Sequence, residues 1–308
     1  MSLDGSRSSD PDGPIQRFEW RADGKSIATA AKATVRLPVG EHTLSLLATD
    51  AVGATGYGGT RVTVLPKDDP VPPRHRLALW LKADAIDKLK DGDPVVMWPD
   101  SSLNGLDPFQ VQASKRPVWK GKAVNDLPAI RFDGVDDHLR SRYFRDLFFT
   151  SYKVSVFAVF RATGAVESRG LVSANWTALA TTGEKGGGLV YSTAFAAPEN
   201  KTVWTSVSPS RAGGIRPDRW TLGAVVRSGN RAGETRLRVN GVRDDSATAV
   251  PYHSMNAEHG FIGCLRGGNG CWKGDVAEVL IYGDALSDAD CQAVERYLRT
   301  KYGLDDEK

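Results

Sequence analysis

Aromatic side chains in the latter half of the chain have the chemistry of a sugar-binding surface. Flat rings stack on the C–H faces of sugars, and such a site combines apolar area with a few placed polar groups. The candidate ligand-binding rings are Trp176, Tyr191, Trp204 and Trp272. Arg266 and Asn269, in the glycine-rich loop just before Trp272, are the polar candidates because they offer directional hydrogen bonds. Trp176 and Trp272 flank loops and are the expected anchors.

Tryptophan also has a purely structural interpretation. Most tryptophans of a β-sandwich lie in its core. Trp80, Trp98 and Trp220 stand among apolar strand residues, and we assign them to the core. The same alternative stays open for each candidate ring, and the exposure of the ring decides between the two.

The cysteines predict one disulfide. The 3 cysteines are too few for a disulfide-rich scaffold. Cys264 and Cys271 flank a short glycine-rich loop, and two strands joined by such a loop bring the Cβ atoms within bonding range. We therefore expect a disulfide between them. Cys291 occupies an apolar position of a helical pattern and is expected to be a buried free thiol.

The composition is that of a folded, turn-rich chain. Of 308 residues, 41% are apolar and 25% are charged, with 32 Gly and 16 Pro. These values suit an all-β protein and exclude collagen, coiled coils and wholesale disorder. The net charge is +3 with the two signs interspersed, which predicts neither a nucleic-acid groove nor a polybasic membrane patch. No apolar run approaches the ~20 residues of a membrane span.

The clearest domain boundary is the segment Pro66-Lys-Asp-Asp-Pro-Val-Pro-Pro73. Its prolines favour extended backbone and exclude both a helix and a central strand. The sequence predicts a first domain over residues 1–66, a short stiff linker over 67–74, a second domain over 75–304 and a tail over 305–308.

Strand patterns dominate both domains. Short alternating segments separated by Gly, Pro and Asp turns predict an antiparallel sandwich in the first domain and two packed sheets of the jelly-roll kind in the second. Predicted strands of the second domain include Leu77–Ala83, Val95–Trp98, Lys153–Ala162, Trp220–Arg227 and Asp275–Tyr282.

One helix closes the chain. Ser287 offers a hydroxyl acceptor and Asp290 follows three residues later, which is close to a capping box. Cys291, Val294 and Leu298 recur at helical spacing. Gly303 supplies a left-handed stop, so we expect this helix to pack on the sandwich.

Residues 1–66 resemble a PKD domain, an immunoglobulin-like sandwich common in extracellular multidomain proteins. The matching segments are Ser8–Gly13, the strand Phe18-Glu-Trp20, Leu37–Thr43 and Leu47-Ala-Thr-Asp50. The family's first strand is absent, so we expect a truncated module within a longer protein.

The PKD resemblance also implies a cofactor. Some members of that family bind Ca²⁺ in this region, which makes Asp10, Asp12 and Asp50 candidate calcium ligands. The alternative is that Asp10 and Asp12 cap turns in the segment Asp-Pro-Asp-Gly. No other cofactor is expected.

The second domain resembles the laminin-G-like branch of the concanavalin-A-like lectin/glucanase superfamily. The matching segments are Leu77–Ala83, Trp98–Ser102, Pro128–Asp137, Asp275–Tyr282 and Leu286–Asp290. The resemblance implies a jelly-roll sandwich, so the expected fold class is all-β: a truncated immunoglobulin-like sandwich, a concanavalin-A-like jelly roll and a C-terminal helix. A fold alone does not identify a ligand.

Related glucanases place paired carboxylates at alternate positions of one strand, where one is the nucleophile and the other the acid. The nearest pair here is Asp275 and Glu278. A spacing of three puts them on opposite strand faces, with Asp275 in a turn, so we expect no catalytic residues. Asp133 and Asp136 are expected to hydrogen-bond the backbone of a turn, with calcium binding by Asp136 and Asp137 as the alternative.

The expected function is non-catalytic binding of a glycan or another cell-surface or extracellular ligand. The expected setting is a larger extracellular or cell-surface bacterial protein whose other domains are further partners. One alternative is a structural spacer or adhesion role with no small-molecule ligand. A polysaccharide-cleaving enzyme is the other alternative.

Overall fold

The computed structural model describes residues 1–304 apart from 39, 65–69, 142–152, 168, 175–176, 183–187, 197–201, 207–214, 230, 232–233, 245–259 and 266–269. The chain divides into two compact units, Met1–Asp69 and Pro70–Lys308. The division falls within the proline-rich segment that the sequence marks as the boundary.

The smaller unit consists of two antiparallel sheets. Strands β3, β2, β5 and β6 form one sheet in that order, and β1 pairs with β4 in the other. Leu3, Ala22 and Leu44 are buried in its small core. The strands are β1 (Ser2–Asp4), β2 (Ile15–Ala22), β3 (Lys25–Ala28), β4 (Lys32–Thr34), β5 (Gly40–Asp50) and β6 (Thr55–Val64).

The larger unit contains an eight-stranded and a six-stranded sheet. The eight-stranded sheet has the order β18-β17-β16-β11-β20-β9-β8, and β7 also pairs with β20. Its strands are β7 (Leu77–Lys82), β8 (Val118–Val124), β9 (Leu127–Asp133), β11 (Val154–Ala162), β16 (Trp220–Arg227), β17 (Thr235–Val239), β18 (Val242–Asp244) and β20 (Lys273–Tyr282).

The six-stranded sheet has the order β10-β19-β12-β13-β14-β15. Its strands are β10 (Leu139–Ser141), β12 (Gly170–Ala174), β13 (Thr177–Thr182), β14 (Gly188–Ala196), β15 (Thr202–Ser206) and β19 (Gly260–Ile262). Two short 3-10 helices, Ala83–Ala85 and Ala113–Lys115, complete the described elements of the unit together with α2.

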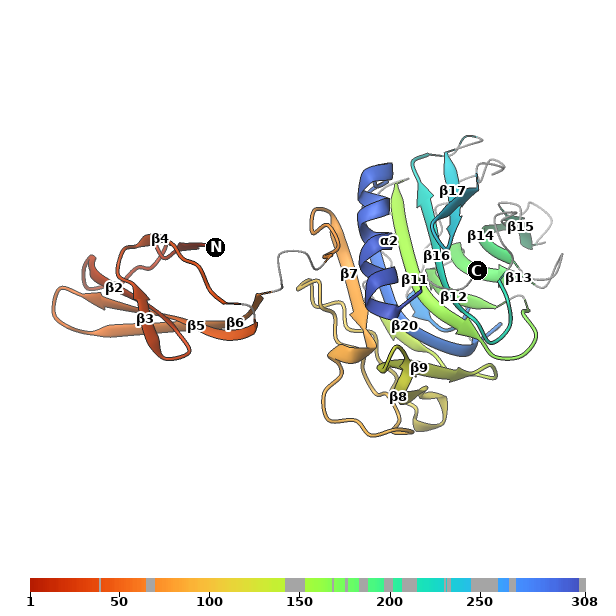
Figure 1. The fold of residues 1–308 in the computed structure, drawn as a ribbon, viewed down its shortest axis with the longest axis horizontal. Coiled ribbons are helices and arrows are strands. Elements are labelled where there is room, and N and C mark those ends of the chain that lie inside the picture. The colour runs from red at the N-terminus through yellow and green to blue at the C-terminus, as the bar shows by residue number, and fades with distance from the viewer. Residues whose placement is uncertain are drawn as a thin grey trace. The chain divides into compact units, whose positions relative to one another are not determined.

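The eight-stranded sheet has an apolar surface on both faces. Side chains alternate along a strand, so β11 sends Val156, Ala158 and Phe160 into the core shared with the six-stranded sheet. Phe157 and Val159 point the other way, into a second core with α2. We refer to the side of the sheet covered by α2 as its outer face. Figure 1 shows α2 lying along this face.

Helix α2 (Asp288–Tyr302) begins and ends as the sequence predicts. Ser287 is the N-cap, and its hydroxyl accepts a hydrogen bond from the backbone N–H of Asp290 at 3.1 Å. Gly303 adopts a left-handed conformation with φ 62°, which a glycine tolerates without a Cβ penalty. The prediction of a capped helix packed on the sandwich is confirmed.

One predicted strand is wrong. Val95–Trp98 contains one isolated bridge, between Met97 and Phe109, and a second bridge, between Pro94 and Val118, directly precedes the segment. Val95 and Trp98 are buried nonetheless, so the apolar pattern reflects a buried segment without a continuous ladder. Within the described part of the chain, no helix has the length and apolar character that a membrane crossing requires.

Candidate functional site

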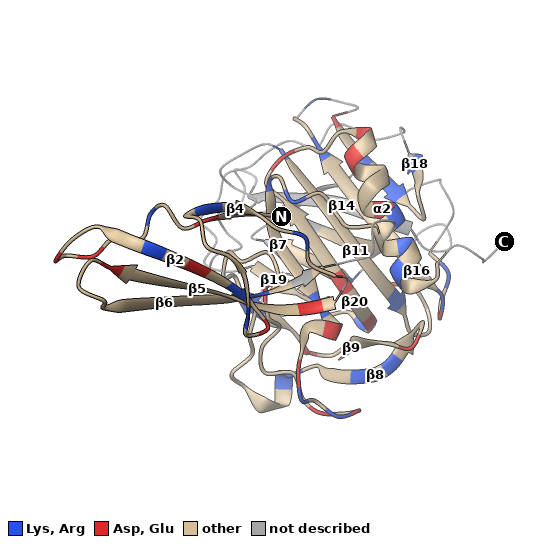
Figure 2. Ribbon diagram, turned by 60° about the vertical axis from the view of Figure 1, so that its left-hand side comes forward, with Lys and Arg blue, Asp and Glu red and all other residues tan. Residues whose placement is uncertain are grey.

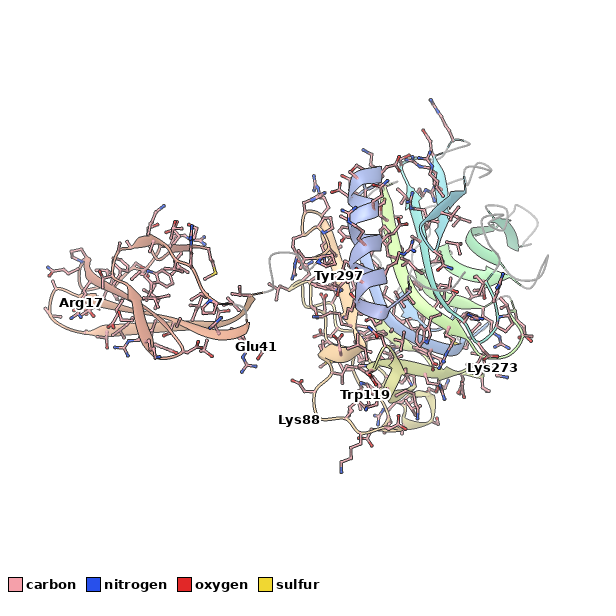
Figure 3. The ribbon with its side chains drawn as sticks, in the orientation of Figure 1. Arg17, Glu41, Lys88, Trp119, Lys273 and Tyr297 are labelled. Atoms are coloured by element: carbon pink, nitrogen blue, oxygen red, sulfur yellow. A yellow bond between two sulfur atoms is a disulfide. The ribbon has the colours of Figure 1, made fainter. Side chains whose placement is uncertain are left out.

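A cavity of about 460 Å³ opens on the larger unit where β20 begins. Lys273, the first residue of β20, is exposed at this place (Figure 3). The cavity combines cationic, anionic and apolar side chains. Its lining residues are Val118, Arg131, Phe132, Asp133, Asp137, Arg161, Thr163, Asp218, Lys273 and Gly274.

Strand alternation places three charged residues together on the outer face. Ile130 and Phe132 of β9 point into the core shared with the six-stranded sheet. Arg131 lies between them and therefore points to the outer face. Arg161 follows the inward-pointing Phe160 of β11, and it pairs in register with Asp275 of β20. The apolar core under α2 does not include these three side chains, so the outer face becomes polar beyond it.

Asp275 holds both arginines. Its carboxylate is fully buried and accepts two hydrogen bonds from Arg131, from Nε at 2.7 Å and from Nη2 at 3.1 Å. Arg161 also donates to it from Nε, at 3.0 Å, and from Nη2. Hydrogen bonding to Asp275 raises the pKa of Arg131. One buried anion therefore orients two guanidinium groups, and within the described part of the chain the Nη1 of each is left for another acceptor.

Trp220 extends this polar surface with an aromatic face. The ring is only partly buried, and the guanidinium of Arg161 lies 5.0 Å from its centre. This is a cation–π arrangement, and it further restricts the Arg161 side chain. Trp220 packs against the apolar core under α2 but is not fully buried, so its assignment to the core holds only in part, whereas Trp80 and Trp98 are buried as expected.

Two residues of an acidic turn, Asp133 and Asp137, also line the cavity. Asp133 accepts backbone N–H groups of Val135, Asp136 and Asp137 through Oδ1. Asp137 accepts the backbone N–H of Asp133 at 3.0 Å. Burial raises the pKa of Asp137 to about 6, and the neighbouring charge of Asp133 adds to the shift. The turn interpretation is thus confirmed for Asp133, whereas for Asp136 it stays a prediction.

The acidic turn also has the ligand chemistry of a hard cation. Carboxylate oxygens of Asp133, Asp136 and Asp137 lie within 4.8 Å of one another, and Ca²⁺ prefers oxygen ligands. In the described part of the chain, Asp10, Asp12 and Asp50 do not belong to such a cluster. Calcium binding by those three residues stays a prediction.

Two of the three expected calcium ligands of the smaller unit, Asp10 and Asp50, stabilise turns. Asp10 accepts the backbone N–H of Asp12 at 2.8 Å. Asp50 is buried and accepts the backbone N–H groups of Val52 and Ala54. These are Asx-type contacts, and for Asp10 they are what the alternative interpretation predicts, whereas a capping role of the Asp12 side chain stays a prediction.

Trp272 is not an exposed anchor. The ring is 1% exposed and packs edge-on against Phe160, with ring centres 5.4 Å apart. The expectation that it stacks on a sugar is wrong, because strand alternation at the start of β20 turns Trp272 into the core and Lys273 outward. The predicted disulfide between Cys264 and Cys271 is present, and Cys291 is a buried free thiol as expected.

The remaining candidates fall largely outside the described residues. Trp176, Arg266 and Asn269 lie outside them altogether. For Tyr191 and Trp204 the structure describes the backbone, in the adjacent strands β14 and β15. Their roles in binding stay predictions.

The placement predicted for the two carboxylates of β20 is wrong. Opposite Val159 and Phe160, the register of β20 shifts by one residue, so that Glu278 pairs with Val159 and Val276 with Phe160. This bulge puts Asp275 and Glu278 on the same, outer face of the sheet.

Both carboxylates are fully buried, and Asp275 is a strand residue rather than a turn residue. Glu278 accepts hydrogen bonds from Trp80 Nε1 at 2.6 Å and from the Tyr302 hydroxyl at 2.7 Å. It also pairs with Lys301 at 2.7 Å. Glu278 therefore anchors α2 and does not face the cavity.

Sequence reasoning missed the cationic side of the cavity. Arg131 and Arg161 each interrupt or end an apolar strand run, and a charge on a strand with apolar neighbours on both faces is a usable signal. Their convergence on Asp275 is not readable, because the partners are 144 and 114 residues apart.

Comparisons with known proteins place the larger unit in a structural context. The family model described as the concanavalin A-like lectin/glucanases superfamily matches residues 133–292. A search of curated proteins gave no match. Among solved structures, domain 4 of a GH43 extracellular arabinanase from Geobacillus stearothermophilus, in complex with arabinotriose, is similar with a TM-score of 0.50 and 16% identity. The match covers 72% of this chain and 98% of that domain.

Two further solved structures are similar at lower scores. The sialidase of Trypanosoma rangeli in complex with sialic acid has a TM-score of 0.46 and 13% identity, over 85% of this chain and 43% of the sialidase. The binding domain of botulinum neurotoxin DC in complex with SialylT has a TM-score of 0.43 and 12% identity, over 73% of this chain and 52% of that one.

Proposed function

The chain belongs to the concanavalin A-like lectin/glucanases superfamily, and from this premise we propose that its larger unit binds a carbohydrate without cleaving it. The observation that carries the proposal is the cavity at the start of β20, where Asp275 holds two arginines beside a partly exposed tryptophan. The arabinanase domain, solved with arabinotriose, supports a sugar as the class of ligand.

The cavity offers both kinds of hydrogen-bonding group that a sugar hydroxyl uses. Arg131, Arg161 and Lys273 donate, and Asp133 and Asp218 accept. Because acids and bases both line the cavity, its charges largely cancel, which favours a neutral polyhydroxyl ligand over a highly charged one. Guanidinium groups fixed in advance lose little side-chain entropy when they bind.

The arrangement of carboxylates supports binding rather than hydrolysis. A glycosidase needs two carboxyl groups that reach the substrate from either side of the scissile bond. Asp275 and Glu278 are fully buried and engaged by arginine and by lysine, tryptophan and tyrosine, respectively. Of the carboxylates that line the cavity, Asp133 and Asp137 already accept backbone N–H groups, which leaves no pair of unengaged carboxylates among the described lining residues.

A carbohydrate-binding unit of this kind suits an extracellular or cell-surface protein that meets glycans there. The disulfide between Cys264 and Cys271 supports such an oxidising setting. The smaller unit then acts as an accessory module, for which the PKD-like interpretation stays a proposal. A purely structural spacer role predicts no ligand for the cavity.

The test compares two exposed lysines of the larger unit. Lys273→Ala removes a donor that lines the cavity, and Lys122→Ala is the matched control because its side chain is 83% exposed and lies outside the cavity. The intact chain is titrated calorimetrically with arabinotriose and with a panel of neutral oligosaccharides, and product release is assayed in parallel.

We expect binding without turnover, about tenfold weaker in Lys273→Ala, since a hydrogen bond from a charged donor contributes ~1.5 kcal/mol. Lys122→Ala should match the unaltered chain. Binding to none of the sugars, or equal loss in both variants, would refute the proposal. Release of shortened sugars would favour the hydrolase alternative.

A further inference from the structure

The last strand of the smaller unit has an open edge. β6 is the end strand of its sheet, and the described residues contain no strand on its other side (Figure 2). Residues 55–60 are all exposed. Proteins usually protect such an edge with lysine, proline, a bulge or a covering loop. β6 contains neither lysine nor proline, and its register with β5 is continuous.

The backbone groups that point outward can be identified. The N–H of Asp50 donates to the carbonyl of Ala54 at 3.0 Å, and in an antiparallel pair every second residue repeats this contact. Residues 56, 58, 60, 62 and 64 therefore bond β5. The N–H and C=O groups of residues 55, 57, 59, 61 and 63 point toward the open edge.

The side chains on this edge have a distinct pattern. Val62 packs against the small core, so Tyr57, Gly59 and Arg61 lie on the opposite face of the sheet. Tyr57 is 73% exposed. Its hydroxyl covers Gly59, because a methyl group at that glycine would lie 3.1 Å from the Tyr57 oxygen. Arg61 is exposed and is the single charge of β6.

We propose that a second copy of this chain docks on this edge, with the two β6 strands antiparallel and Gly59 on the two-fold axis. In this register each Tyr57 lies directly opposite Arg61 of the second copy, and Thr55 lies opposite Thr63. Every one of these residues presents its N–H and C=O outward, so the ladder of hydrogen bonds is complete.

Self-complementarity favours a second copy over an unrelated strand. The two-fold register repeats the Tyr57–Arg61 pairing twice, and opposed aromatic and guanidinium groups attract one another. It keeps the two Arg61 side chains apart, whereas centring the pair on residue 61 would set like charges face to face. Gly59 at the axis leaves room for the two tyrosine rings.

Dimerisation through β6 would place two copies of the larger unit on one particle. Weak sugar sites gain avidity when they are linked in this way. The inference does not rest on the proposed sugar site, since it follows from the smaller unit alone.

The experiment is sedimentation velocity of the intact chain across a concentration series. Tyr57→Lys places a lysine opposite Arg61 of the second copy, at both ends of the two-fold pair. Val52→Lys is the matched control, because Val52 is 85% exposed and precedes β6 in the turn from β5. The double variant Tyr57→Lys, Arg61→Glu restores opposite charges at the same positions.

We expect the unaltered chain and Val52→Lys to form dimers as the concentration rises. Tyr57→Lys should weaken the dimer at least tenfold, and the double variant should recover most of it. We expect each variant to fold because both altered residues are exposed, and circular dichroism checks this. A chain that stays monomeric at all concentrations, or a dimer indifferent to Tyr57→Lys, would overturn the proposal. Either result would leave a foreign strand as the remaining occupant of the edge.

Discussion

Truncation of Trp272 measures how deeply this ring is buried. The side chain is 1% exposed, and replacing a buried tryptophan by alanine costs ~3–5 kcal/mol. The edge-on contact with Phe160 at 5.4 Å adds to the loss, since aromatic pairs contribute ~0.5–1.5 kcal/mol beyond their buried area. We therefore expect Trp272→Ala to destabilise the larger unit by about 4 kcal/mol.

Trp272→Phe provides the matched control. The indole Nε1–H is buried and has no hydrogen-bond partner among the described residues. Leaving a buried donor unsatisfied costs ~1–3 kcal/mol, and phenylalanine removes that donor while it keeps most of the ring. Removing the unsatisfied donor offsets much of the packing energy lost with the smaller ring, so Trp272→Phe should destabilise the larger unit by about 1 kcal/mol or less.

The assay is urea unfolding of the intact chain, followed by tryptophan fluorescence. Of the 8 tryptophans, Trp20 alone lies in the smaller unit, so the signal reports mainly on the larger one. A loss of 4 kcal/mol should also lower the melting temperature by roughly 10 °C in a domain of this size. If Trp272→Ala cost under ~1 kcal/mol and instead weakened oligosaccharide binding, the ring would be an exposed anchor and the reasoning from burial would fail.

Two further predictions concern charged groups. Asp275→Asn should destabilise the larger unit by about 2 kcal/mol in the same urea assay. This is less than the ~3–5 kcal/mol lost when a fully buried ion pair is broken, because both arginines reach solvent. An unchanged unfolding midpoint would contradict a stabilising role of the ion pairs between Asp275 and the two arginines. In the smaller unit, the hydrogen bond between His42 and Asp23 raises the pKa of His42 and lowers that of Asp23. Because the folded-state pKa of His42 is raised, the protonated histidine stabilises the fold at pH values below the ordinary histidine pKa of 6.5. This contribution is lost as the pH rises through the folded-state pKa. The melting temperature of the smaller unit should therefore fall as the pH rises above about 6.5. In His42→Gln the melting temperature should depend less on pH over this range.

The C-terminal helix shows what a single sequence predicts well. Its start depends on the hydroxyl of Ser287 and its end on the missing Cβ of Gly303, and both signals are local. Local chemistry also predicted the disulfide, because the two cysteines are only seven positions apart in the sequence. In each case the interacting groups are close in sequence, so no knowledge of the sheet order is needed.

The cavity shows what the sequence does not reveal. A one-residue bulge in β20 changes which face Glu278 occupies, and nothing in Asp275-Val-Ala-Glu278 marks its position. The same strand turns Trp272 inward and Lys273 outward, although a loop-flanking tryptophan beside a cysteine suggested the reverse. Register sets which side chain faces solvent, and register depends on partner strands that are distant in sequence.

The ion pairs of Asp275 with Arg131 and Arg161 are poorly explained by stability alone. Burying a carboxylate costs several kcal/mol, and a well-packed apolar residue at the same place would often be at least as stable. Asp275 nevertheless lies fully buried beneath Arg131 and Arg161, which are 43% and 25% exposed at the side chain. What the buried anion provides is fixed orientation, since a guanidinium held at Nε and Nη2 presents its remaining N–H groups in one plane. A site that must recognise hydroxyl geometry benefits from that rigidity. Asp275→Asn should therefore reduce the free energy of sugar binding by more than it reduces the free energy of unfolding. If the ion pairs were purely structural, the substitution would reduce the free energy of unfolding alone.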